Sequence, residues 1–173
     1  MLVYLSMIET DENKTKFEQI YIQYRDLMYY IAYRRLHHVQ DAEDAMHHAF
    51  VKIAENIRII EPPCAKTKQL VVTIVENHVT DLLRAKGRHP ETELGDYEPS
   101  GLDVEDMAID LLSQCILLLP QKQRNVIWLK YHHGYSLKEI SKLLDISLSD
   151  AQKTDQRAKA KLGQLYIERG GEL

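Results

Sequence analysis

The side chains best suited to chemistry lie near the end of the chain, where cations and hydroxyl groups recur at helical spacing. Lys153 and Arg157 are four residues apart, so one helix would present both on the same face. Ser147, Ser149 and Gln152 stand on or just before the same stretch. Ammonium, guanidinium, hydroxyl and amide groups bind phosphate oxygens and base edges. The segment therefore predicts nucleic-acid binding.

Two segments that begin with serine predict the pair of helices that would carry these side chains. Ser136 and Glu139 have the spacing of a capping box, in which the serine caps a helix and the glutamate bonds back to it. Ser147 and Asp150 repeat that spacing. Two capped helices separated by a turn of about three residues are typical of a helix-turn-helix, whose second helix enters the major groove. A plain helical hairpin with the same apolar spacing is the alternative.

A second basic cluster closes an earlier predicted helix. Arg84, Lys86 and Arg88 follow an apolar stripe that begins near Lys66 and precede Pro90. Cations suit the negative end of the helix dipole and can also hold phosphates. We therefore treat this helix end as a second candidate DNA contact.

Metal chemistry is the weaker alternative. Asp44 and His47 have the spacing of two ligands on one helix, but a two-metal helical bundle needs a second such motif and two more acids, which the sequence lacks. Cys64 and Cys115 are far apart and in no metal spacing. We predict no cofactor, no metal site and no catalytic residue, and keep an unrelated helical metal enzyme as the lesser alternative.

The composition predicts an all-α protein with two small helical domains. The chain has 173 residues, is 45% hydrophobic and contains only seven Gly and five Pro. Apolar residues recur at steps of three and four in most stretches. The expected helices cover residues 17–36, 41–57 (capped by Asp41), 66–88, 111–119, 124–131, 137–144 and 148–165.

Charge divides the chain further. The net charge is −4, yet Glu91 to Asp110 contains eight acidic residues and no Lys or Arg, between two basic blocks. This acidic stretch lacks periodicity and predicts a linker. We place one domain at residues 1–89, a flexible acidic linker at 90–103 and a helix-turn-helix domain at 104–173. No stretch approaches the roughly 20 apolar residues of a membrane span, so we expect a cytoplasmic protein.

Both halves of the chain carry the pattern of a known family. Residues 119–127 read Leu-Pro-Gln-Lys-Gln-Arg-Asn-Val-Ile, and Gly134, Ser136, Glu139-Ile140 and Arg157-Ala158 follow. This pattern resembles the sigma-four domain of bacterial RNA polymerase sigma factors. Asp41-Ala42-Glu43-Asp44-Ala45 with Phe50, then Asn77, Asp81, Arg84 and Arg88, resembles the sigma-two domain. With a short linker, the chain is similar to the extracytoplasmic-function group.

The resemblance implies a factor that directs RNA polymerase core to promoters. It implies core docking by the helix after residue 41, through Asp41, Glu43, Asp44, Phe50 and Ile53. It implies contact with the minus-ten element by Asn77, Asp81, Arg84, Lys86 and Arg88. At the minus-thirty-five element it implies contact by Ser136, Lys138, Ser147, Ser149, Gln152, Lys153 and Arg157. The expected partners are core polymerase and promoter DNA, with an anti-sigma factor as a further candidate. A helix-turn-helix regulator or a degenerate sigma-like protein that supports no initiation is the alternative.

The sequence departs from the family at two places. The loop from Arg58 to Thr67 matches the place where the family captures a flipped base of the melted strand, and no aromatic residue occurs from Asn56 to Asp96. Asp155 falls on the apolar stripe of the second predicted helix, and an unpaired buried carboxylate is costly. We therefore predict that Asp155 is either exposed or paired with Lys130, His132 or Lys159.

Overall fold

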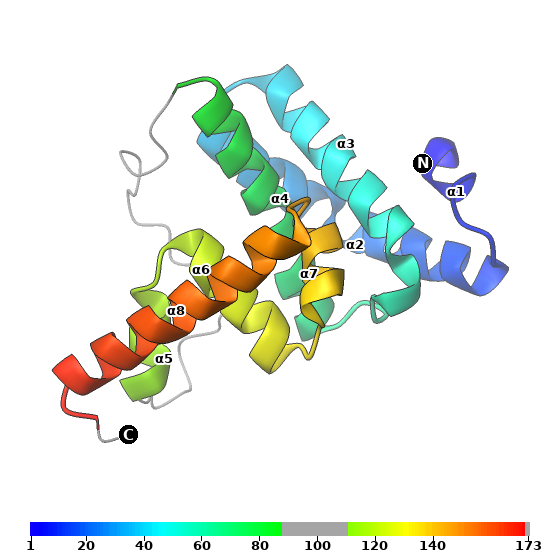
Figure 1. Ribbon diagram of the computed structural model, residues 1–173. Coiled ribbons are helices and arrows are strands. Elements are labelled where there is room, and N and C mark those ends of the chain that lie inside the picture. The colour runs from blue at the N-terminus through cyan, green and yellow to red at the C-terminus, as the bar shows by residue number, and fades with distance from the viewer. Residues whose placement is uncertain (88–110, 172–173) are drawn as a thin grey trace. The chain divides into compact units, whose positions relative to one another are not determined.

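The computed structural model describes residues 1–87 and 111–171, and within these ranges it contains helices and turns but no strand (Figure 1). The all-α prediction is confirmed. The chain divides into two compact units, Met1–Gly101 and Leu102–Leu173. The predicted acidic linker lies outside the described residues. No helix in the described ranges combines the length and apolar composition needed to cross a membrane.

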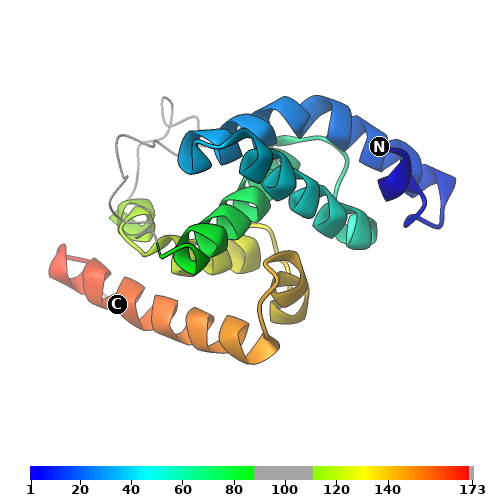
Figure 2. The same ribbon diagram turned by 90° about the horizontal axis from the view of Figure 1, so that it is seen from above.

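The first unit is built on a long helical hairpin. Helix α2 (Asp11–Leu36) is capped by Thr10, whose hydroxyl accepts from the backbone of Asn13. It ends at His37, which takes a left-handed conformation with φ 51° and turns the chain into α3 (Val39–Glu55). Helix α3 returns along α2, and α4 (Ala65–Ala85) packs on both (Figures 1 and 2). A four-residue helix, α1 (Leu2–Leu5), and a 3₁₀ turn, η1 (Ile57–Ile59), complete the unit.

Apolar stripes of the three long helices meet in the core of this unit. The largest side chains that are fully buried here are Phe17, Ile20, Met28, Leu36, Phe50, Ile53, Ile60 and Leu70. Burial of each such side chain contributes about 1.5–3 kcal/mol before the cost of chain ordering. The core thus fixes which face of α3 and α4 points outward.

The second unit consists of shorter helices. It contains α5 (Leu111–Leu117), α6 (Gln121–Ile127), α7 (Leu137–Leu143) and α8 (Leu148–Glu168). The helix predicted for residues 124–131 starts earlier, because Pro120 stands at its N-cap, and it ends in a π turn, η2 (Trp128–His132). Leu129, Ile140, Leu143 and Leu144 are buried, as is Ala151 of α8, and α7 packs on α8. A second apolar cluster joins Leu119 and Ile127 to Ala158, Leu162 and Leu165.

Candidate functional site

The outward face of α3 is acidic. The side chains of Glu43 and Asp44 are exposed, and they are consecutive residues in the first half of the helix. Asp41 is not the cap that we predicted. The helix begins two residues earlier, at Val39, and the ring of His38 accepts from the Asp41 backbone instead, at 3.3 Å. The Asp41 carboxylate lies 2.5 Å from the ammonium of Lys86, at the end of α4.

Phe50 and Ile53 do not belong to that outward face. Both side chains are completely buried in the core of the first unit. The prediction of direct polymerase contact by Phe50 and Ile53 is therefore corrected, since neither offers surface to a partner in this structure. The physical reason is the helical period, which places Phe50 and Ile53 on the same inward face of α3 as the buried residues Ala42, Ala45 and Ala49.

The C-terminal end of α4 is polar, but its residues are engaged to different degrees. Asn77 is buried, and its amide donates to Asp81 at 3.4 Å. Asp81 also lies 3.6 Å from Arg84, whose side chain is 54% exposed. Lys86 pairs with Asp41 as described, and Arg88 lies outside the described residues. The structure therefore leaves Arg84 as the most available cation at this end, whereas Asn77 points to a neighbour within its own helix.

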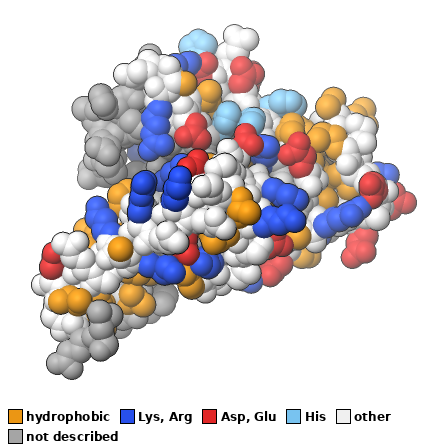
Figure 3. Space-filling model, viewed as in Figure 1, with side chains coloured by type: hydrophobic (Ala, Val, Ile, Leu, Met, Phe, Trp, Pro, Cys, Tyr) orange, Lys and Arg blue, Asp and Glu red, His pale blue; other side chains and the backbone are white. Residues whose placement is uncertain are grey.

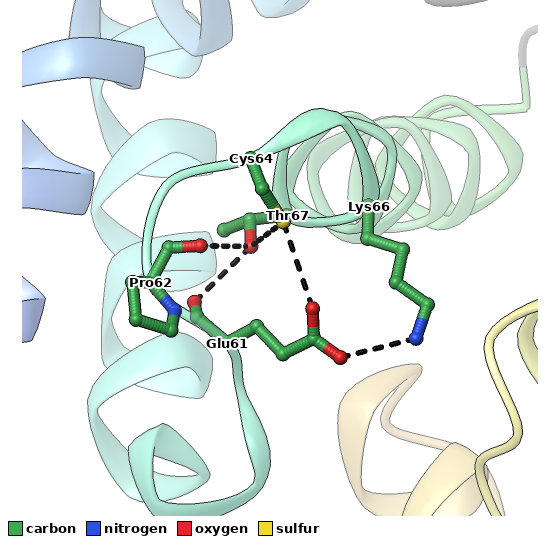
Figure 4. A network of polar contacts seen from close by, with 5 residues as sticks. All are labelled: Glu61, Pro62, Cys64, Lys66 and Thr67. Atoms are coloured by element: carbon green, nitrogen blue, oxygen red, sulfur yellow. Dashed lines mark hydrogen bonds and ion pairs between the residues drawn. The ribbon is translucent and has the colours of Figure 1, made fainter.

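The loop before α4 is held by a compact network (Figure 4). The Thr67 hydroxyl donates to the backbone carbonyls of Glu61 at 3.1 Å and Pro62 at 2.8 Å. Lys66 pairs with the Glu61 carboxylate at 3.0 Å. The phenol of buried Tyr24 donates to the Cys64 carbonyl, and burial raises the pKa of Tyr24. These bonds fix the segment that the family resemblance associates with single-stranded DNA.

The helix-turn-helix pattern is present in the second unit. Ser136 and Glu139 form the predicted capping box: Ser136 N–H donates to Glu139 Oε2 at 2.8 Å, and Glu139 N–H donates to Ser136 Oγ at 3.3 Å. The bonds from Ser136 lower the pKa of Glu139. Ser147 caps α8 by accepting from the backbone of Asp150 at 3.0 Å. Between the helices Asp145 has φ 56°, the left-handed conformation that Asp tolerates better than most residues.

One face of α8 presents the predicted DNA-contact side chains. Ser149, Gln152, Lys153 and Arg157 are all exposed, and their steps of one, three and four residues keep them on one side of the helix. Figure 3 shows Lys and Arg side chains gathered over the part of the molecule that α8 occupies in Figure 1. Lys138 is exposed on α7. Ser136 and Ser147 are committed to their caps.

Asp155 lies on the opposite, inward face of α8 and is paired. It is 3% exposed, and its carboxylate accepts from Lys130 at 2.6 Å and from the Tyr131 hydroxyl at 3.2 Å. Lys159 lies 3.6 Å away. The hydrogen bond with Asp155 raises the pKa of Lys130. The predicted pairing with Lys130 and Lys159 is confirmed. The contact with Tyr131 was not predicted, because Tyr131 lies in a π turn and the apolar spacing of the sequence does not indicate that turn.

Comparison with known proteins matches two separate parts of the chain to two family models. Residues 20–89 match the family described as Sigma-70 region 2, and residues 109–162 match Sigma-70, region 4. The chain is 30% identical over 155 residues to the ECF RNA polymerase sigma factor SigW of Bacillus subtilis (strain 168), across 80% of this chain and 82% of the relative. The chain belongs to the ECF group of RNA polymerase sigma factors.

A solved structure provides a more distant likeness. It is the sigma factor RpoE in complex with the anti-sigma factor NepR from Bartonella quintana. It covers 87% of this chain and 96% of its own chain, with 17% sequence identity and a TM-score of 0.40.

Proposed function

We propose that this chain binds RNA polymerase core and promoter DNA through separate faces of its two units. Family membership defines a promoter-directing sigma factor. The observation that carries the proposed residue roles is the outward presentation of polar side chains on α8, a helix whose start is capped by a serine, as is the start of α7. The activity is binding alone, with no chemistry assigned to any side chain, and we place it in the cytoplasm. An inhibitory anti-sigma partner stays a prediction.

The docking face is the exposed acidic side of α3. Glu43 and Asp44 meet solvent there, while buried Phe50 and Ile53 hold the helix against the core. An acidic surface complements a basic one on the partner, which steers association and fixes orientation. Asp41 supports this face indirectly, because its ion pair with Lys86 joins the start of α3 to the end of α4.

The DNA-contact residues fall into two kinds. Arg84, Lys86, Lys153 and Arg157 carry charge and are suited to phosphates. Gln152 and Ser149 offer neutral donors and acceptors for base edges. Ser136 and Ser147 act through their caps, by fixing where α7 and α8 begin. Arg88 and Lys138 complete the proposed set as phosphate contacts.

The test uses the purified chain with RNA polymerase core lacking any sigma factor. We expect the two to co-elute and the mixture to initiate transcription on a pool of promoter fragments, whereas core alone does not. DNA binding without association with core would identify a helix-turn-helix regulator. Association with core without initiation would identify a degenerate sigma-like protein.

A further inference from the structure

The short N-terminal helix α1 exposes apolar side chains and lies outside the family match, which begins at residue 20. Leu2 is 83% exposed and Val3 is 66% exposed, and Met1 and Met7 are also exposed. Figure 3 shows hydrophobic side chains gathered where α1 lies in Figure 1. Sigma-70 region 2 therefore does not account for this surface.

Tyr4 anchors α1 on the first unit. Its ring is 5% exposed and lies 5.5 Å from Phe17 and 5.8 Å from Phe50, measured between ring centroids. Its hydroxyl lies 2.6 Å from Nδ1 of His47, on α3. A helix of four residues does not persist by its own hydrogen bonds. The packing of Tyr4 therefore holds α1, and with it the apolar side chains on its other face, in a fixed place.

The connection from α1 to α2 is also tied down. Ile8 is 5% exposed, and the carboxylate of Glu9 pairs with Arg58, in the η1 turn. The buried Tyr4 and Ile8 alternate with the exposed Leu2, Val3 and Met7. The segment thus has an inward side that packs on the unit and an apolar outward side.

The position of His47 places α1 beside the acidic docking face. On α3, His47 follows Asp44 by three residues and Glu43 by four, so the three side chains are neighbours one turn apart. The tilted contact between the rings of Tyr4 and His47, with centroids 5.2 Å apart, brings α1 to this same turn. The exposed apolar side chains of α1 therefore lie next to the acidic docking face of α3.

We propose that α1 extends the polymerase docking surface, with Leu2 and Val3 as apolar contacts next to Glu43 and Asp44. The partner is a protein surface on the polymerase core that presents basic and apolar side chains together. This inference rests on the proposed function. An anionic membrane is disfavoured because the neighbouring carboxylates would repel it. A second copy of the chain is also disfavoured, because its Glu43 and Asp44 would lie close to the same carboxylates of the first copy and repel them.

The test measures binding to RNA polymerase core for two double variants, L2S/V3S and E43K/D44K, and for a control variant. We expect L2S/V3S to weaken binding roughly tenfold, since two apolar contacts are lost, without a change in melting temperature. The control is Ile22→Ser, which removes an apolar side chain that is 73% exposed on α2. It should leave binding unchanged.

The variant E43K/D44K separates this inference from the proposed function. If E43K/D44K weakens binding and L2S/V3S does not, the role of α1 is overturned while the docking face stands. If neither variant weakens binding, the docking face itself fails. Sedimentation of the free protein should show a monomer, and a dimer that L2S/V3S dissociates would overturn the proposal. Binding to vesicles of anionic phospholipid that L2S/V3S abolishes would also overturn it.

Discussion

At the scale of single residues, Asp155 shows how one carboxylate fixes the rotation of a helix. Its oxygens accept from two consecutive residues of the π turn, Lys130 and Tyr131, and lie near Lys159 of its own helix. The pairing locks the inward face of α8. As a result Gln152, Lys153 and Arg157 face outward together.

We expect Asp155→Leu to destabilise the protein by roughly 1–3 kcal/mol, because the Lys130 ammonium and the Tyr131 hydroxyl lose their shared acceptor. The value stays moderate because the Lys130 side chain is 27% exposed and can turn to solvent. Urea unfolding measures the change. In a double-mutant cycle, Lys130→Met should cost less in the Asp155→Leu background than in the wild type. Equal costs in both backgrounds would show that the ion pair does not couple the two helices.

The same residue marks the limit of reasoning from sequence. The helical stripe shows that Asp155 faces inward, and the cost of an unpaired carboxylate demands a partner. Lys130 and Lys159 are within the predicted set, but Tyr131 donates to Asp155 from the π turn η2, which the sequence did not predict. Likewise, Phe50 and Ile53 show that an apolar residue on a docking helix can belong wholly to the core.

At the scale of elements, capping chemistry is what the sequence predicts best. The caps Ser136 and Ser147 were both placed correctly, because side-chain caps depend on residues close in the chain. The start of α3 was placed incorrectly, because His38 competes with Asp41 for the cap and no simple preference favours a histidine. The anchoring of α1 by Tyr4 joins residues 43 positions apart and could not be predicted from local spacing.

The capping box of α7 gives a prediction with a pH dependence. We expect Ser136→Ala to cost about 1 kcal/mol near neutral pH. Because the pKa of Glu139 is lowered in the folded state, its carboxylate stabilises the protein above the ordinary Glu value and loses that effect as the pH falls through the folded-state pKa. The cost of Ser136→Ala should therefore shrink in acid. Unfolding midpoints at neutral and acidic pH measure this, with exposed Ser149→Ala as the control. A cost that does not change with pH would contradict the role of Glu139.

The outward face of α8 gives a prediction about salt. Replacing both Lys153 and Arg157 with Gln should lower the slope of log affinity against log salt by about 0.9 per lost phosphate contact, for duplex DNA of mixed sequence. The control replaces Lys14 and Arg25, which both lie on α2, with Gln, so the same charge is removed from the other unit. An unchanged slope in K153Q/R157Q would remove these residues from the DNA-contact face.

At the scale of the whole molecule, local charge matters more than the net charge of −4. The acidic side chains Glu43 and Asp44 stand exposed on one unit, and the cations Lys153 and Arg157 stand exposed on the other. A protein that binds both polymerase and DNA requires such a separation, because one sign of charge cannot serve both partners. The all-α fold and the order of the two units follow from the sequence. The acidic stretch from Glu91 to Asp110 lies outside the described residues.

The affinity of the E43K/D44K variant for RNA polymerase core measures whether the acidic face of α3 is the docking surface. The matched control is D26K/E168K, which makes the same change in net charge at exposed sites, one in each unit. We predict that E43K/D44K loses at least tenfold in affinity for core and keeps the wild-type melting temperature, while D26K/E168K binds core as the wild type does. Equal affinities for the wild type and E43K/D44K would show that the acidic face of α3 is not the docking surface.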